Sequence, residues 1–303
     1  MQDRRVSLTA LVSAYARAYH ATHDNPKIFD DFIAAQLFTE QERAFFAKNL
    51  AAALPFFDPE LAARYPDEAS ALACVMRIQN APITLCRSRY TEDCLEQAVA
   101  AGVEQYVILG AGLDTFAFRK PTLMNKLQVF EVDHPLMQAD KQRRLAALGL
   151  EQPAGLHWIP ADLTQDLVAA LKNSPYDPLK LSFVSWLGVT YYLSHQEIFQ
   201  TLHTIAGIAP AGSSIIFDYF DADAFVPERA GKLARRVLEI LKNAGEPMRT
   251  GLAPDTLPSD VAQVGFRLVE NLSPGDIEAR YFSGRTDGYH AFEQVHLAQA
   301  RVA

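Results

Sequence analysis

The sequence predicts an α/β protein in which helices cover both faces of a mainly parallel, doubly wound sheet, with a helical cap before it. Apolar residues recur at helical spacing up to about residue 103, and near-continuous apolar segments alternate with helices beyond it. Two further strand candidates close the chain and predict an antiparallel hairpin at one sheet edge. We expect residues 1–102 to form the cap and 103–303 the sheet domain, packed as one unit, with an insertion at 222–258.

The expected elements of the cap are helices. Apolar residues at helical spacing between Leu8 and Tyr19 predict the first helix, and prolines separate several short helices after it. A further helix is expected over 91–102. Thr91 would be its N-cap, acidic residues would follow in the first turn, and Gly102 would end it.

Short apolar segments after the cap predict the strands of the sheet. The five expected parallel strands cover residues 105–110, 127–133, 156–161, 181–189 and 213–220. A helix should follow the second strand to about Leu148, and another should begin near Ser194 with Glu197 as its capping-box partner. A long helix is expected over 222–246 and a proline-containing loop over 247–258, before closing strands at 266–272 and 290–300.

Composition excludes several classes of protein. Hydrophobic residues make up 49% and charged residues 21% of the 303, which is typical of a folded globular chain. The net charge of −8, without a local basic patch, gives no reason to expect a nucleic-acid partner. The longest stretch without Asp, Glu, Lys or Arg, 198–217, contains proline, glycine and hydroxyl residues and is no membrane span. Three cysteines without a C-x-x-C pair and the lack of a secretory signal predict a cytoplasmic protein.

The candidate ligand site lies where the predicted strands end, because open α/β sheets bind ligands at their carboxyl edge. Residues 110–115, Gly-Ala-Gly-Leu-Asp-Thr, follow the first strand, either as a loop that lets backbone approach a ligand or as a tight strand-to-helix turn. The second strand ends in Glu131 and Asp133, about twenty residues later, where a carboxylate can accept hydrogen bonds from both ribose hydroxyls. Asp162 follows the third strand, as a partner for an adenine amine or as a helix N-cap.

The glycine loop argues against a nicotinamide dinucleotide. Thr115 stands where the dinucleotide fingerprint needs a third small residue, and bulky phenylalanines follow it. Asp114 would lie near a pyrophosphate and repel it. An adenosine without phosphates fits better. S-adenosylmethionine is such a ligand, and its sulfonium cation tolerates a nearby acid.

Seven stretches of the chain carry a family resemblance: residues 9–18, 87–93, 110–115, 130–135, 161–163, 188–193 and 281–288. In them the sequence resembles the leucine carboxyl methyltransferase-like family of S-adenosylmethionine-dependent methyltransferases, and more closely its bacterial O-methyltransferase branch. The stretches follow the family's order over nearly the whole chain. The resemblance implies a class I methyltransferase (Rossmann-like) fold, S-adenosyl-L-methionine as cofactor, and methyl transfer to a carboxylate or hydroxyl of a small molecule.

The resemblance also implies roles for single residues. Arg89 would clamp the methionine carboxylate of the cofactor. The remaining cofactor contacts would come from Gly110, Ala111, Gly112, Asp133 at the ribose, and Asp162 and Leu163 beside the adenine. The carboxyl methyltransferases have a cofactor-contacting Glu after the fourth strand, where this chain has Leu187. That difference weakens the transfer of this contact, and of the leucine-carboxylate substrate, to this chain.

The acceptor side of the site is less clearly marked. Tyr191 and Tyr192 follow the fourth strand, near the expected point of methyl transfer, and His20 is a candidate general base. Arg249, Tyr281 and Arg285 are candidates for binding the acceptor. A carboxylate acceptor needs no general base, whereas a hydroxyl or phenol does, and the sequence leaves both open. Acidic residues after the fifth strand, Asp218, Asp221 and Asp223, match no metal-binding loop, so no metal is expected.

Three other functions remain as alternatives. A nicotinamide oxidoreductase would require the glycine loop to accept a pyrophosphate. A non-catalytic protein that keeps the cofactor fold is compatible with Leu187. A methyltransferase acting on a protein C-terminal carboxylate would share every cofactor residue named above. The sequence indicates neither the acceptor nor the oligomeric state.

Overall fold

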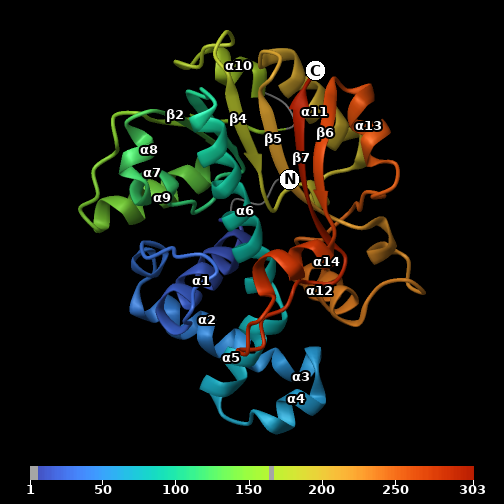
Figure 1. Cartoon of the computed structure of the whole chain (residues 1–303). Coiled ribbons are helices and arrows are strands. Elements are labelled where there is room, and N and C mark those ends of the chain that lie inside the picture. Colours follow the sequence, from blue (N-terminus) through green and yellow to red (C-terminus); the bar gives the residue numbers. More distant parts are fainter. Residues whose placement is uncertain (1–5, 164–166) are drawn as a thin grey trace.

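A computed structural model of the chain describes residues 6–163 and 167–303, and within them the strands form one seven-stranded sheet in the order β3-β2-β1-β4-β5-β7-β6 (Figure 1). The strands are β1 (Gln105–Leu109), β2 (Gln128–Asp133), β3 (Leu156–Pro160), β4 (Ser182–Trp186), β5 (Ser214–Phe220), β6 (Phe266–Leu272) and β7 (Val295–Val302). The first five pair in parallel, while β7 is antiparallel to both β5 and β6. The predicted fold class is confirmed.

Both faces of the sheet are buried, which explains its near-continuous apolar strands. In β1, Tyr106 and Ile108 belong to one core cluster, and the alternate residues Val107 and Leu109 belong to another. Successive strand residues point to opposite faces, so burial of every β1 residue requires a covering layer on each side. The helices that follow the sheet strands are α7 (Phe116–Arg119), α8 (Pro121–Met124), α9 (Pro135–Ala147), α10 (Leu167–Lys172), α11 (His195–Ile208) and α13 (Leu257–Gln263).

The helix α11 begins as the sequence predicts. Its N-cap, Ser194, accepts a hydrogen bond from the amide of Glu197 at 3.3 Å. The Glu197 carboxylate accepts in return from the Ser194 amide at 2.6 Å. This reciprocal capping box satisfies two amides that the first turn of a helix leaves without partners.

Two predicted helix boundaries are wrong. The helix expected over 91–102 is the second half of a longer helix, α6 (Asn80–Ala100), and Thr91 is buried in its middle. Pro82 does not interrupt α6, because it lies in the first turn, where amides have no intrahelical partner. The segment expected as one helix over 222–246 forms a short 3-10 turn, η3 (Ala222–Phe225), and the helix α12 (Lys232–Asn243), with Pro227 between them.

Strand ends also differ from the expectation. The fourth strand ends at Trp186, because Gly188 adopts φ 74° and turns the chain away from the sheet. The closing strand begins at Val295, and β6 and β7 are joined through α14 (Pro274–Ile277) and the π-helical turn η4 (Glu278–Phe282). The closing strands are therefore antiparallel neighbours, as expected, with a long connection instead of a tight hairpin.

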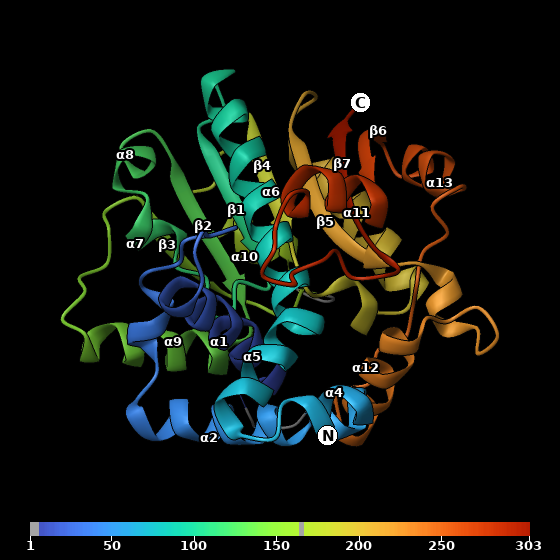
Figure 2. The ribbon, with the colours of Figure 1, turned by 60° about the horizontal axis from the view of Figure 1, so that its bottom comes forward.

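The N-terminal helices lie together at the carboxyl end of the parallel strands (Figures 1 and 2). They are α1 (Leu8–His23), η1 (Ala34–Leu37), α2 (Glu40–Ala52), α3 (Leu54–Phe57), α4 (Pro59–Arg64), α5 (Glu68–Ile78) and the first half of α6. The helix α6 continues from this group along the sheet and contacts β4. One helix thus spans both parts, and a domain boundary at residue 102 stays a prediction.

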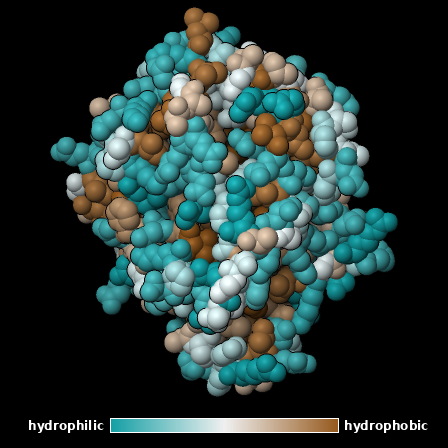
Figure 3. Space-filling model, viewed as in Figure 1, coloured by the Kyte–Doolittle hydropathy of each residue, from teal (hydrophilic) through white to brown (hydrophobic). Residues whose placement is uncertain are grey.

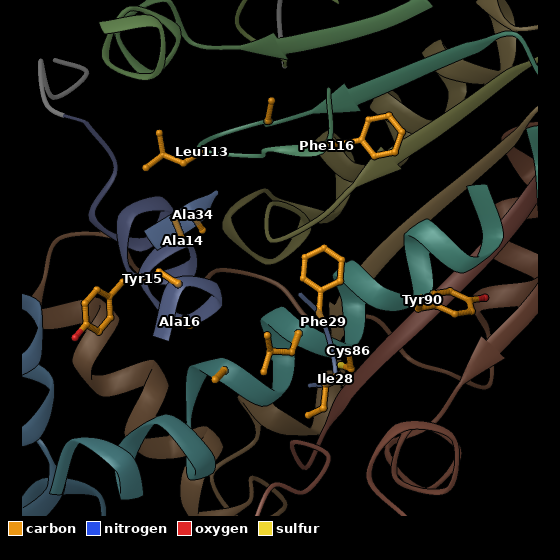
Figure 4. Close-up of a cluster of buried hydrophobic side chains, with 14 of the residues drawn as sticks. Ala14, Tyr15, Ala16, Ile28, Phe29, Ala34, Cys86, Tyr90, Leu113 and Phe116 are labelled. Atoms are coloured by element: carbon orange, nitrogen blue, oxygen red, sulfur yellow. The ribbon is translucent and has the colours of Figure 1, made fainter. Parts of the chain in front are cut away.

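A shared core joins the cap to the glycine loop. Figure 4 shows Ala14 and Tyr15 of α1, Phe29 of the following loop, and Leu113 and Phe116 after β1 in one buried cluster. The face of the molecule in Figure 3 is mainly hydrophilic, with hydrophobic residues in small separate groups. No helix within the described residues has both the length and the apolar character that a membrane crossing requires.

Candidate active site

A cavity of about 550 Å³ lies at the carboxyl ends of β1, β2 and β4, beneath α1. One wall consists of the loop after β1, residues 110–114, and Asp133 at the end of β2. We call this the cofactor wall. The opposite wall combines α1, α6, residues 187–192 and residues 246–249. We call this the cap wall.

The glycine loop has a conformation that only glycine fits well. Gly110 adopts φ 68° and Gly112 adopts φ 52°, in the left-handed region. A Cβ atom on Gly110 would also lie 2.6 Å from Cγ2 of Val189, which belongs to the cap wall. The lack of a side chain therefore brings the two walls together at this point.

Asp133 is held by the backbone with its carboxylate at the cavity. Oδ2 accepts a hydrogen bond from the Gly112 amide at 2.6 Å, and Oδ1 accepts from the His134 amide at 2.6 Å. Burial raises the pKa of Asp133, although both amides favour its charged form. Each carboxylate oxygen has a second lone pair, so Asp133 can still accept hydrogen bonds from two hydroxyl groups of a ligand.

Asp162 and Leu163 follow β3 beside the cofactor wall. Neither lines the cavity, but Cδ1 of Leu163 lies 3.8 Å from the position that a Cβ on Gly110 would take. The Ala161 amide donates to the Asp133 carbonyl at 3.0 Å, which keeps the end of β3 next to the end of β2. Of the other residues assigned to the cofactor from the sequence, Gly110, Ala111, Gly112 and Asp133 all line the cavity.

Arg89 does not reach the cavity. Its Nε donates to Asp93 Oδ1 at 2.8 Å on the outer face of α6, and its side chain is 49% exposed. Arg87, two residues earlier, is buried and lines the cavity. Two residues of a helix point to nearly opposite sides, so only one of these arginines can face inward. In a helix over 80–100, Arg87 lies on the same face as the buried Ile83, Tyr90 and Cys94. The predicted helix start at Thr91 left Arg87 outside the helix, so this shared face could not be recognised from the sequence.

Arg87 is part of a buried network with β5 and the loop after β4. Its Nη1 donates to Asp218 Oδ2 at 2.9 Å and to Tyr191 Oη at 3.1 Å. Asp218 Oδ1 accepts from the Gly188 amide at 2.6 Å. A Cβ on Gly188 would lie 2.7 Å from Nη2 of Arg87, so the guanidinium packs directly on this backbone.

A second ion network joins the cap to the glycine loop. Arg17 of α1 lines the cavity, donates to Asp31 Oδ2 at 2.8 Å, and donates to the Leu113 carbonyl at 2.7 Å. Asp31 Oδ1 also accepts from Thr115 at 2.7 Å and lies 3.3 Å from Arg119 Nε. Burial alone would raise the pKa of Asp31, but the two guanidinium groups and the Thr115 hydroxyl lower it overall. Asp31 is therefore charged at neutral pH.

Tyr191 and Tyr192 line the cavity, in the 3-10 turn η2 (Thr190–Tyr192). Burial raises the pKa of Tyr192 to about 12 and raises that of Tyr191 further. Both phenols are therefore protonated at neutral pH. They can donate or accept hydrogen bonds, but they are poor general bases.

His20 lies outside the cavity and has no free ring nitrogen. It is fully buried; Nε2 accepts from the Ile28 amide at 2.7 Å, and Nδ1 lies 2.8 Å from Asp24 Oδ2. This pattern assigns the proton to Nδ1. Tyr289 donates to the same Asp24 oxygen at 2.8 Å. The geometry contradicts a general-base role and gives His20 a structural one.

Of the three predicted acceptor-binding residues, Arg249 alone lines the cavity. Its side chain is 54% exposed at the mouth, and Nη1 lies 3.4 Å from Glu197 Oε2. Arg285 donates to the Pro26 carbonyl at 2.7 Å and pairs with Asp287, so it joins the tail to the cap. Tyr281 lies in η4, packed against the cap core.

Glu246 is a cavity residue that the sequence does not reveal. Its carboxylate accepts from the Leu8 amide at 2.9 Å, from the Thr9 amide at 3.2 Å and from the Thr9 hydroxyl at 2.6 Å. It thereby binds the first turn of α1 to the segment after α12. No sequence signal marks a contact across more than 230 residues. Among residues 6–163 and 167–303, no three His, Cys, Asp or Glu side chains gather as a metal site would require.

Comparison with known proteins shows which family and which solved structures this chain is similar to. Residues 10–206 match the model of the family described as leucine carboxyl methyltransferase. A relative with the provisional name S-adenosyl-L-methionine-dependent methyltransferase YktD, from Bacillus subtilis, is 40% identical over 99% of each chain. A structure from Thermobifida fusca, provisionally described as a methyltransferase, superposes with a TM-score of 0.56 at 17% identity, covering 96% of this chain and 94% of its own. An O-methyltransferase family protein from Burkholderia thailandensis gives 0.51 at 13% identity, over 93% and 74%.

Proposed function

This chain belongs to the leucine carboxyl methyltransferase family and uses S-adenosyl-L-methionine as its cofactor, and we propose that it is an O-methyltransferase acting on a carboxylate or hydroxyl of a small molecule. The observation that supports this best is the cavity itself. Its cofactor wall carries Asp133 and the glycine loop, and its cap wall carries Arg87 and Arg249. Its volume of about 550 Å³ is that of a small-molecule site.

The residues fit the cofactor. In this proposal, residues 110–112 lie against the adenosine, Asp133 binds the ribose hydroxyls, and Asp162 and Leu163 flank the adenine. Arg87 takes the role that the sequence suggested for Arg89, because it is the arginine of α6 that lines the cavity. Both hydrogen bonds described for Arg87 leave from Nη1. Its Nη2 and Nε can therefore bind the methionine carboxylate.

The glycine loop disfavours a dinucleotide in its place. Oδ1 of Asp114 accepts a hydrogen bond from the Phe116 amide at 2.7 Å. That amide begins α7, where a pyrophosphate would bind in a dinucleotide fold. The position is thus filled by a carboxylate of the protein itself.

When bound, the cofactor would supply an electrophilic methyl group on a sulfonium, with a neutral thioether as the leaving group. The protein has to align the acceptor oxygen with that methyl group and exclude water from the cavity. The described lining residues include no histidine, lysine or cysteine. The three carboxylates among them, Asp114, Asp133 and Glu246, each already accept a hydrogen bond from a backbone amide. Tyr191 and Tyr192 stay protonated, since burial raises the pKa of each. A carboxylate acceptor, which arrives deprotonated, therefore fits the site better than a hydroxyl.

Localisation forms part of the same proposal. Cys74, Cys86 and Cys94 are buried free thiols. Burial raises the pKa of Cys86 to about 12 and of Cys94 to about 11, which makes both unreactive. Free thiols of this kind are typical of proteins in a reducing compartment, and we therefore propose a cytoplasmic location.

The first test is isothermal titration with S-adenosylmethionine, S-adenosylhomocysteine and NAD. We expect micromolar-range binding of the first two and none of NAD. Methyl transfer from radiolabelled S-adenosylmethionine to a panel of carboxylic acids, phenols and alcohols then tests the reaction. Label that alkali releases as methanol identifies a methyl ester, whereas label stable to alkali identifies an ether.

Each other outcome selects an alternative. NAD binding alone would overturn the interpretation of the glycine loop. Cofactor binding without turnover on the whole panel would favour a non-catalytic protein of the same fold. Turnover only on peptides with a free C-terminus would favour a protein carboxylate acceptor.

A further inference from the structure

Asp218 is a buried carboxylate behind the cap wall of the cavity, without a role in the function proposed above. It lies on β5, and its side chain is fully buried. Oδ2 accepts from Arg87 Nη1 at 2.9 Å, and Oδ1 accepts from the Gly188 amide at 2.6 Å. Its backbone carbonyl accepts from the Thr190 hydroxyl at 2.6 Å. One residue thus contacts α6 and two points of the loop after β4.

These contacts place the carboxylate against a buried cation. The Arg87 side chain is only 9% exposed, and a buried guanidinium needs a counter-charge. Burial alone would lower the pKa of Arg87, but the charge of Asp218 and then Tyr191 raise it overall. The ion pair therefore holds the Arg87 guanidinium in one place.

The pair also determines which edge of the guanidinium faces a ligand. Asp218 and Tyr191 both receive their hydrogen bonds from Nη1. The amide of Gly188 donates to Oδ1 of Asp218, and a Cβ on Gly188 would lie 2.7 Å from Nη2, so this residue packs against the same guanidinium group. The Asp218 carboxylate thus determines how the guanidinium is oriented, both along its edge and on its face. The donors on Nη2 and Nε are left for another partner.

We propose that Asp218 is a positioning residue, which orients Arg87 and the Gly188 turn together so that the guanidinium receives the amino-acid end of the cofactor. This inference rests on the proposed role of Arg87 in binding the methionine carboxylate. Asp218 acts through Arg87 and does not itself touch the cofactor. It should therefore affect ligands that carry the carboxylate and spare those that lack it.

The test compares S-adenosylhomocysteine with 5′-methylthioadenosine, which has the same adenosine and thioether but no amino-acid group. In Asp218→Asn, one of the two bound N–H donors must face the amide NH₂ instead of an acceptor, whichever way the amide is turned. We expect S-adenosylhomocysteine to bind 10- to 50-fold more weakly by titration calorimetry, and 5′-methylthioadenosine to change less than 3-fold. Asp223→Asn, an exposed aspartate just after the same strand, is the matched control.

A second variant reaches the same guanidinium by another route. Gly188→Ala leaves the buried carboxylate in place, but its Cβ would meet the guanidinium at 2.7 to 3.0 Å. It should reproduce the selective loss of S-adenosylhomocysteine affinity. Binding of 5′-methylthioadenosine shows in each case that the variant is folded. If Asp218→Asn does not fold, Gly188→Ala alone decides.

Two results would overturn the inference. Equal loss of both ligands would show a general structural role. Unchanged or tighter binding of S-adenosylhomocysteine would show that Asp218 acts on the ligand only as an opposing charge. Arg87→Gln separates these failures from a failure of the proposed function. If it does not discriminate between the ligands, the cofactor role of Arg87 is wrong. If it does and Asp218→Asn does not, only the inference about Asp218 fails.

Discussion

The two walls of the cavity are built from very different stretches of sequence. The cofactor wall comes from residues 110–114 and Asp133, two adjacent strand ends within about 25 residues of each other. The cap wall combines parts of α1, α6, the loop after β4 and residues 246–249, which lie up to about 240 residues apart. Of the residues predicted for the cofactor, Gly110, Ala111, Gly112 and Asp133 line the cavity, whereas Arg89, Asp162 and Leu163 do not. Of those predicted for the acceptor side, Tyr191, Tyr192 and Arg249 line it, whereas His20, Tyr281 and Arg285 do not.

The difference shows what kind of information each wall requires. Parallel strands place their carboxyl ends at one edge of the sheet whatever covers it, so a residue that ends a strand is located by the strand alone. A residue on a cap helix is located by the helix phase and by how the helix packs. One misplaced helix start is enough to assign Arg89 to the cavity, although Arg87 is the residue that lines it.

The largest expected effect tests the cofactor wall. Asp133→Ala removes the acceptor that we propose for two ribose hydroxyls, and it leaves the Gly112 amide without its partner. Charged hydrogen bonds of this kind contribute about 1.5 to 3 kcal/mol each, so the loss of two should weaken S-adenosylmethionine binding at least about 100-fold. Titration calorimetry measures this, and 5′-methylthioadenosine should lose affinity equally because it carries the same ribose. Unchanged affinity for both ligands would remove Asp133 from the cofactor site.

The next effect tests a cap residue for stability instead of catalysis. His20→Ala leaves the Ile28 amide and Asp24 without their buried partner and opens a cavity. The free energy of unfolding should fall by about 2 kcal/mol, with cofactor affinity unchanged. Urea denaturation measures the first and calorimetry the second. His23→Ala, three residues along α1 and exposed, should change stability by less than about 0.5 kcal/mol. Intact stability with lost turnover would restore His20 as a base.

A smaller effect concerns the contact between the cap and α9. Glu42 of α2 accepts hydrogen bonds from Arg144 of α9. Chiefly because of these hydrogen bonds, the pKa of Glu42 falls to about 2. The Glu42 side chain is 32% exposed. A lowered folded pKa contributes stability above the unfolded value near 4.5, which is lost as the pH falls toward 2. After allowance for solvent screening, Glu42→Gln should reduce unfolding free energy by about 1 kcal/mol at pH 7.

Denaturation of wild type and Glu42→Gln at several pH values checks this. The difference between them should shrink between pH 4.5 and 2, as Glu42 becomes protonated in the wild type. Glu40→Gln, at the start of the same helix and without a described contact to Arg144, is the control. A difference that stays constant over this range would mean that the ion pair does not connect the cap to α9 energetically.

The smallest expected effect sharpens the comparison at α6. Arg89→Ala breaks only an exposed i, i+4 pair with Asp93, which contributes about 0.3 to 0.5 kcal/mol. Cofactor affinity should change less than 2-fold. Arg87→Ala, measured in parallel, should weaken S-adenosylmethionine binding at least 10-fold. The reverse ranking of the two variants would mean that α6 presents its other face to the cofactor.

The sequence by itself determined the order of strands and helices after residue 103, the antiparallel closing strands, and the glycine loop with its acidic strand end. Each of these depends on neighbours close in the chain: apolar strands between turns, a capping box at Ser194 and Glu197, and a carboxylate about twenty residues after a glycine loop. The predicted boundaries at Thr91 and over 222–246 are wrong, because a capping residue or a proline does not by itself decide where a helix begins or ends. Pro82 lies in the first turn of α6 and does not interrupt the helix, whereas Pro227 lies between η3 and α12. The effect of a proline on a helix therefore depends on where in the helix it falls.

Only the tertiary structure decided which side chains share the cavity. Glu246 reaches the first turn of α1, Asp218 reaches Arg87 and Gly188, and Asp31 joins Arg17 to Thr115. No periodicity encodes these pairs, since each network joins segments that are far apart in the sequence. His20 shows the same limit in reverse: its type suits catalysis, but burial and two hydrogen bonds occupy both ring nitrogens. Helices, strands and turns follow from neighbouring residues in the sequence. Whether a polar side chain is free to bind a ligand depends on the buried groups that it contacts in the folded protein.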